Sequence, residues 1–81
     1  MEITEVMENK KNYIELLLLA DEQEDMIDRY IDKGKMYVLD DNGIKCECVV
    51  IDVGNGVLEI KNIATVPEYQ GKGYAKAMID F

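Results

Sequence analysis

Three runs rich in β-branched and aliphatic residues fill most of the second half of the chain, and short turn signals separate them. Such runs favour strands, and Asn-Gly or Gly-Asn-Gly tips supply the positive φ angles that tight hairpins require. The runs are residues 35–40, 44–53 and 57–66, and the tips are Asp41-Asn42-Gly43 and Gly54-Asn55-Gly56. The sequence therefore predicts an antiparallel meander, to which a weakly alternating segment at residues 2–7 adds a short first strand.

Helices are predicted on both sides of this meander in the sequence. Apolar residues at helical spacing indicate one helix over residues 11–20 and a second from Asp21 to Gly34, with Asp21 and Glu24 as its cap. Residues 74–81 again carry apolar side chains on one helical side. The expected fold class is α+β: a mixed α/β half-domain with an antiparallel three- to four-strand meander, two helices before it and one after.

The length and charge of the chain limit its organisation and partners. With 81 residues it forms one domain at most, so residues 1–81 are expected to belong to a single domain. The net charge of -8 argues against nucleic acid, because phosphate neutralisation dominates such binding. Residues 1–41 carry twelve acids against five bases, and residues 42–81 carry five against four. A strongly anionic ligand is therefore expected only in the second half.

Targeting signals and cysteine usage predict a cytoplasmic location. No apolar run approaches the roughly 18 residues that cross a bilayer, and the first residues are acidic where a secretory signal would be basic. Cys46 and Cys48, two residues apart on a predicted strand, point to the same face without the geometry of an easy disulfide. The chain has no histidine to complete a zinc site, so no metal is expected.

The segment Gln70-Gly71-Lys72-Gly73-Tyr74-Ala75 leads from the last predicted strand into the last predicted helix. A turn of this kind presents unpaired backbone N–H groups in one direction, which makes it a cradle for anions, and Lys72 and Lys76 add positive charge. The spacings of a P-loop and of a dinucleotide fingerprint are absent. The alternative is a tight turn that binds nothing.

This segment resembles, position for position, the Q/R-x-x-G-x-G/A signature of the GNAT superfamily of acyl-CoA-dependent N-acetyltransferases. Residues 58–69 resemble the fourth strand of that family and its approach to the pyrophosphate loop, and the order of predicted elements is that of the family's first half. The chain is thus similar to the amino-terminal half of a GNAT domain, ending after the pyrophosphate-loop motif. About the last twenty-four residues carry the specific part of the likeness.

The resemblance implies transfer of an acetyl group from acetyl-CoA to a primary amine of a small molecule. It implies that amides of residues 71–75 bind the coenzyme A pyrophosphate, while backbone groups of residues 64–66 pair with the pantetheine like an added strand. The implied cofactor-binding residues are Ala64, Thr65, Val66, Gln70, Gly71, Lys72, Gly73, Tyr74, Ala75 and Lys76.

Glu59, eleven residues before Gln70, occupies the place where some members of the family carry a glutamate base that deprotonates the amine. The alternative is an exposed strand carboxylate paired with Lys61 or Lys45. The family's later segment, which normally supplies a tyrosine acid, has no counterpart here. Tyr69 and Tyr74 are expected to be packing or surface residues instead.

Two other interpretations remain open. One is a non-catalytic CoA-binding or homodimerising module, in which the unpaired edge of residues 57–66 and the uncovered face of the last helix join a second copy; a homodimer is expected in this case. The other is an α+β domain whose loop binds nothing.

Overall fold

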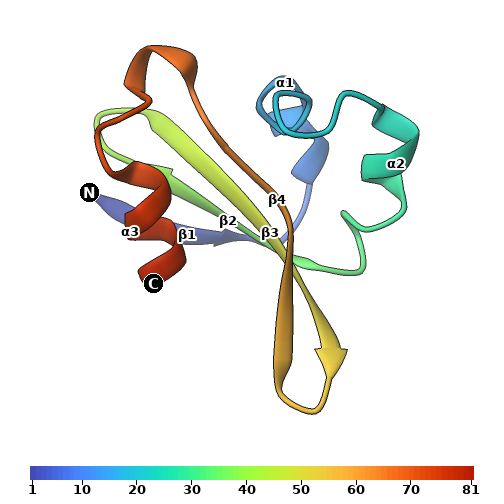
Figure 1. Ribbon diagram of the computed structural model, residues 1–81. Helices are drawn as coiled ribbons and strands as arrows, with labels where there is room; N and C mark the ends of the chain where they lie inside the picture. Colours follow the sequence, from blue (N-terminus) through green and yellow to red (C-terminus); the bar gives the residue numbers. More distant parts are fainter.

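The sheet that organises the molecule has four antiparallel strands in the order β1-β2-β3-β4 (Figure 1). The computed structural model describes residues 1–81. The strands are β1 (Glu2–Val6), β2 (Lys35–Asp40), β3 (Ile44–Gly54) and β4 (Val57–Thr65). This confirms the predicted α+β meander in its four-strand form. Because β4 pairs only with β3, its other edge is open, also as predicted.

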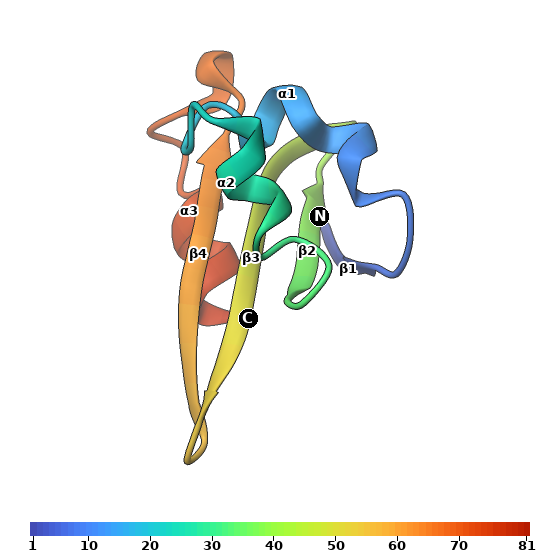
Figure 2. The same ribbon diagram turned by 90° about the vertical axis from the view of Figure 1, so that its right-hand side faces the viewer.

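Both hairpin tips use the asparagines and glycines that the sequence singled out. Asn42 and Asn55 have φ angles of 58° and 56°, in the left-handed region that Asn tolerates better than most residues. The tip of the β3–β4 hairpin extends away from the rest of the molecule in both views (Figures 1 and 2). The turn chemistry therefore fixes the register of the two hairpins.

A bulge interrupts β4 close to Glu59, the residue predicted to act as the general base. Val49 pairs with Asn62 and Val50 pairs with Ile60, which leaves Lys61 without a partner on β3. One extra residue in a strand bends it and increases its twist. The open edge of β4 is consequently bent at Lys61.

The first predicted helix, over residues 11–20, is much shorter than expected. The structure has a 3-10 turn at Lys10–Tyr13, then α1 (Ile14–Leu17). After α1 the amides of Leu19 and Ala20 bond three residues back, which tightens the chain into a turn and ends the helix.

The second predicted helix is also shorter, and its predicted cap is wrong. The helix, α2, covers only Glu24–Asp28, and its N-cap residue, Gln23, makes no side-chain cap bond. Asp21 instead accepts hydrogen bonds from the Gln23 amide at 3.4 Å and from the Tyr30 hydroxyl at 3.2 Å. Gly34 does not adopt a left-handed cap; a Cβ there would lie 2.6 Å from the Val50 carbonyl oxygen, so close packing on β3 requires the glycine.

The helices cover both faces of the sheet, as Figure 2 shows with α1 and α2 in front of it and α3 (Tyr74–Asp80) behind. Alternation along the strands sends neighbouring residues to opposite faces. The α1/α2 face buries a core of Leu17, Ile27, Tyr30, Ile31, Met36, Val38 and Val49. The α3 face buries a smaller core of Leu39, Cys46, Cys48 and Met78. No helix is long and apolar enough to span a membrane.

Three polar or charged residues, Lys45, Glu47 and Asn62, are buried, and no local sequence pattern indicated their burial. Glu47 on β3 is fully buried, neither of its carboxyl oxygens has a hydrogen-bond partner, and burial raises the pKa of this carboxyl to about 8. Asn62 on β4 is buried as well, but its amide nitrogen donates to the Leu17 carbonyl and the Tyr30 hydroxyl, each at 3.0 Å. Asn62 therefore ties β4 to the helical layer.

Candidate functional site

The loop between β4 and α3 owes its shape to two glycines. A 3-10 turn at Pro67–Tyr69 follows β4, and Gly71 and Gly73 then take φ angles of 81° and 87°. Gly73 is the N-cap residue of α3. A Cβ on either glycine would meet no atom within 4 Å, so the left-handed backbone, rather than crowding within the protein, calls for glycine. The space above both residues is open to a ligand.

The backbone amides of this loop are available as donors. No amide from Gly71 to Lys76 donates a hydrogen bond to a group of the protein. The first donor inside α3 is Ala77, whose amide bonds to the Gly73 carbonyl at 3.0 Å. Unpaired amides at the beginning of a helix favour anions, because they present partial positive charge that no protein acceptor neutralises.

A cavity of about 420 Å³ lies beside these amides and brings together most of the predicted binding residues. Its walls come from the end of β4, the loop, the first turn of α3 and the turn after α1. They comprise Leu19, Ala20, Ile63, Ala64, Thr65, Tyr69, Gln70, Gly71, Gly73, Tyr74, Ala75 and Lys76. Of the predicted set, Val66 and Lys72 lie outside the lining. The sequence did not anticipate the contribution of Leu19 and Ala20, which requires knowledge of how α1 docks on β4.

At the end of β4, the backbone groups of one residue bond within the sheet and those of the next face the open edge. The Val66 amide donates to the Lys45 carbonyl at 2.8 Å, so it is already paired within the sheet. Successive residues of a strand point their backbone groups to opposite edges, which directs those of Thr65 outward. The Gln70 side chain, at 3.4 Å, donates to the Thr65 carbonyl. Thr65, rather than Val66, thus offers main-chain groups at the open edge.

Glu59 lies on the same strand, away from the cavity. Its carboxylate is half-exposed and forms an ion pair with Lys61 at 3.0 Å. The structure thus contains the Lys61 pairing that the sequence raised as the alternative to a base. Five residues separate Glu59 from Ala64, which is about 16 Å along a strand.

The basic residues near the loop differ in how free they are. Lys72 is exposed and forms no ion pair, whereas Lys76 pairs with Asp80 at 2.7 Å. Lys45, from the start of β3, is only 8% exposed, and its ammonium lies 3.8 Å from the centroid of the Tyr69 ring. A cation so placed is stabilised by the aromatic face.

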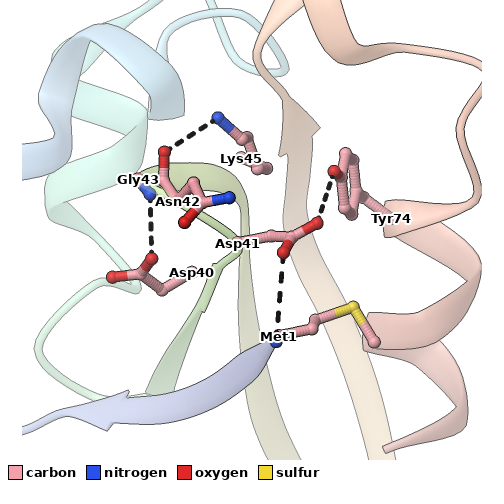
Figure 3. Close-up of polar contacts among 7 residues, drawn as sticks. All are labelled: Met1, Asp40, Asp41, Asn42, Gly43, Lys45 and Tyr74. Atoms are coloured by element: carbon pink, nitrogen blue, oxygen red, sulfur yellow. Dashed lines mark hydrogen bonds and ion pairs between the residues drawn. The ribbon is translucent and has the colours of Figure 1, made fainter.

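The turn between β2 and β3 contacts the loop, and sequence reasoning missed this contact (Figure 3). The Tyr74 hydroxyl donates to Asp41 at 2.8 Å, and this hydrogen bond raises the pKa of Tyr74. Asp41 also lies 3.9 Å from the amino group of Met1. Thirty-three residues separate Asp41 from Tyr74, so no local pattern announces the pair.

The two cysteines lie on the same face of β3, as their spacing predicted. Cys46 and Cys48 are free thiols, both buried against α3 on one face of β3. Burial raises the pKa of Cys46, and it raises that of Cys48 to about 11. Thiols with raised pKa values are poor nucleophiles at neutral pH, since the thiolate is the reactive form.

Comparison with known protein families identifies the family of the chain. The model of the acetyltransferase (GNAT) family matches residues 4–81. No curated protein sequence matches the chain.

Three solved structures resemble the chain closely. An IAA acetyltransferase from Bacillus cereus ATCC 14579 is 31% identical with a TM-score of 0.84, over 98% of this chain and 54% of its own. A GNAT family acetyltransferase from Elizabethkingia anophelis with acetyl-CoA bound is 29% identical with a TM-score of 0.89, over 98% and 52%. A Bacillus subtilis acetyltransferase in complex with CoA is 29% identical with a TM-score of 0.85, over 96% and 52%. The chain thus spans about half the length of these structures.

Proposed function

The chain belongs to the acetyltransferase (GNAT) family, and from that premise we propose that it binds acetyl-CoA and serves the transfer of the acetyl group to a primary amine of a small molecule. One observation carries the proposal: the amides from Gly71 to Lys76 have no acceptor within the protein and adjoin a cavity of about 420 Å³. Similar structures from Elizabethkingia anophelis and Bacillus subtilis contain acetyl-CoA and CoA.

The residues present fit such a ligand in both shape and charge. Free amides and the unpaired ammonium of Lys72 suit a diphosphate, and the outward backbone of Thr65 suits an extended amide-containing arm laid along the edge of β4. The second half of the chain carries a net charge of only -1, from four bases against five acids, so little of the overall -8 opposes an anion there. Acetyl-CoA would supply the activated acetyl group.

For the amine, we propose Glu59 as the base. An amine must lose a proton before it can attack, and an accessible carboxylate near the far end of the binding edge can accept that proton directly or through water. Glu59 is half-exposed and stands on β4 beyond the bulge at Lys61. We also place the protein in the cytoplasm, which suits its two free thiols.

Isothermal titration calorimetry with acetyl-CoA tests the proposal on the unmodified chain and on Gly73→Asp. A side chain at Gly73 would enter the open space, and a carboxylate there would repel a diphosphate, so this variant should lose measurable binding. Gly56→Asp is the matched control, because Gly56 has a similar φ angle of 74° and equally open surroundings in the β3–β4 hairpin. Equal affinities for all three proteins would remove the loop from the proposal.

A second candidate function is a homodimerising module without catalysis. A groove of about 370 Å³ between β3, β4 and α3 is lined only by hydrophobic residues: Tyr37, Cys48, Val50, Leu58, Ile60, Met78, Ile79 and Phe81. Leu58 and Phe81 are 64% and 74% exposed. Exposed apolar surface beside an open strand edge favours association.

Light scattering combined with an assay of thiol release separates the two candidates. The acetyltransferase proposal expects CoA to be released from acetyl-CoA when a suitable amine is added. A homodimerising module should form a dimer that Leu58→Lys converts to a monomer. It should release no thiol from acetyl-CoA with any amine that is tested.

A further inference from the structure

Two side-chain contacts anchor the glycine loop, residues 66–74, to the turn between β2 and β3 and to the start of β3. The Tyr74 hydroxyl donates to an Asp41 carboxylate oxygen at 2.8 Å, as Figure 3 shows. The Lys45 ammonium lies 3.8 Å from the centroid of the Tyr69 ring. In the chain, Tyr69 precedes and Tyr74 follows the segment that carries Gly71 and Gly73. The loop is therefore held on both sides of its glycines by the β2–β3 hairpin.

The two contacts are joined to each other. The rings of Tyr69 and Tyr74 meet edge to face with centroids 6.5 Å apart. On the other side, the ammonium of Lys45 donates to the Asn42 carbonyl at 3.3 Å, which fixes it to the same turn that bears Asp41 (Figure 3). The contacts thus form a closed ring, which the backbone of residues 41 and 42 completes.

The turn that provides these anchors is itself braced. The Asp41 amide donates to the Gly43 carbonyl, and the Gly43 amide donates to the Asp40 carboxylate, both at 2.9 Å. Lys45 contributes a further bond through its carbonyl, which accepts from the Val66 amide at 2.8 Å. Lys45 therefore contacts the loop at Val66 through its backbone and at Tyr69 through its side chain.

We propose that Asp41 and Lys45 are positioning residues for diphosphate binding: by holding Tyr74 and Tyr69, they keep the amides of residues 71–76 directed at one ligand. The inference rests on the proposed binding of acetyl-CoA by this loop. Two glycines give the loop many accessible conformations, and an unanchored loop would have to lose that freedom when the ligand binds. Anchoring removes this entropic penalty in advance.

The sign of one substitution distinguishes positioning from simple electrostatics. Asp41 is an anion near a site for an anion, so removal of its charge should strengthen diphosphate binding if charge alone mattered. If Asp41 acts by holding Tyr74, Asp41→Ala, which removes both the charge and the acceptor, should weaken binding instead. Tyr74→Phe removes the hydroxyl and changes no charge at neutral pH, and it should weaken binding to a similar extent.

Calorimetry with two ligands provides the test: acetyl-CoA and S-acetylpantetheine, which lacks the diphosphate. Asp41→Ala and Tyr74→Phe should each weaken acetyl-CoA binding about 3- to 10-fold, the effect of one lost hydrogen bond, and the double variant should lose no more than either. Lys45→Met, which keeps the aliphatic stem, should also weaken acetyl-CoA binding. Tyr13→Phe is the control, because the Tyr13 hydroxyl makes no hydrogen bond and its ring packs in the core on the α1/α2 face of the sheet. Binding of acetylpantetheine should be the same in all variants.

Three results would overturn the inference: tighter or unchanged acetyl-CoA binding by Asp41→Ala, unchanged binding by Lys45→Met, or an equal loss for both ligands, which would indicate general destabilisation. Failure of the proposed function looks different, because the unmodified chain itself would then not bind acetyl-CoA. An unmodified chain that binds, together with variants that bind equally well, rejects only the positioning role.

Discussion

The side-chain amide of Asn62 donates a 3.0 Å hydrogen bond to the hydroxyl of Tyr30, joining β4 to the turn after α2. The same nitrogen also donates to the Leu17 carbonyl at 3.0 Å. Asn62 is 3% exposed, so water cannot replace either bond if the side chain is removed. A single side chain thus connects the strand that borders the candidate site to both parts of the helical layer.

Asn62→Ala is expected to lower the free energy of unfolding by about 2 to 3 kcal/mol, because it leaves a buried carbonyl and a hydroxyl without their donor. Urea denaturation of Asn62→Ala, Tyr30→Phe and the double variant measures the interaction. We expect a coupling energy of about 1 kcal/mol between the two positions. Strictly additive losses would show that the hydrogen bond contributes nothing.

Glu47 is expected to make stability depend on pH. Burial raises its pKa to about 8 from 4.5, so the folded chain keeps this carboxyl protonated while the unfolded chain ionises it. The stabilisation is complete below pH 4.5, falls by up to about 1.4 kcal/mol per pH unit above it, and is gone above about pH 8.

Glu47→Gln cannot ionise, and it should remove this part of the pH dependence. Urea denaturation at several pH values between 5 and 9 would compare the two proteins. The unfolding free energy of the unmodified chain minus that of Glu47→Gln should decrease as the pH rises. A constant difference across that range would mean that Glu47 is ionised in the folded protein.

Gly73→Ala and Gly56→Ala are expected to have similar effects on stability and different effects on binding. Both glycines have positive φ angles, 87° and 74°, with open space around them, so each alanine should cost about 1 kcal/mol of backbone strain. Only Gly73 adjoins the free amides. Calorimetry should show weaker acetyl-CoA binding for Gly73→Ala, by about tenfold, and unchanged binding for Gly56→Ala. Equal affinities for the two variants would argue against the loop as the site.

From the proposal that Glu59 is the base, we expect Glu59→Gln to lower kcat about 10²- to 10⁴-fold with little change in acetyl-CoA affinity, since removal of a general base has effects of that size. Lys61→Gln provides the comparison because it breaks the same ion pair and keeps the carboxylate. Steady-state rates should fall for Glu59→Gln alone. If both variants retain similar activity, the carboxylate is only the surface partner of Lys61, and such pairs contribute little.

The sequence predicted the strands and the last helix well and the first two helices poorly, for a physical reason. Hairpin tips depend on local φ preferences, and Asn42-Gly43 and Gly54-Asn55-Gly56 express those preferences within two or three residues. The extents of α1 and α2 depend instead on packing against the sheet, since such short helices are unstable alone. The pattern that indicated helices of ten or more residues records which residues are buried, and turns with bonds three residues back bury them equally well.

The candidate site also has one part that the sequence indicates and another part that it does not. The glycine segment was visible because the required residue types are contiguous from Gln70 to Ala75. The pair Asp41–Tyr74 and the Lys45–Tyr69 contact join residues far apart in the chain, and no periodicity indicates them. Alternation could place Glu47 on the opposite face from Cys46 and Cys48, but only the docking of the helices shows that this second face is buried as well.

Two-dimensional NMR of the ¹⁵N-labelled chain during titration with CoA identifies the amides that bind the diphosphate. We expect the backbone amides from Gly71 to Lys76 to show the largest shifts, because they exchange an unpaired state for hydrogen bonds to the diphosphate. Resonances in the β3–β4 hairpin tip should stay in place. Binding that shifts other amides and leaves those six unchanged would show that the diphosphate does not bind at this loop.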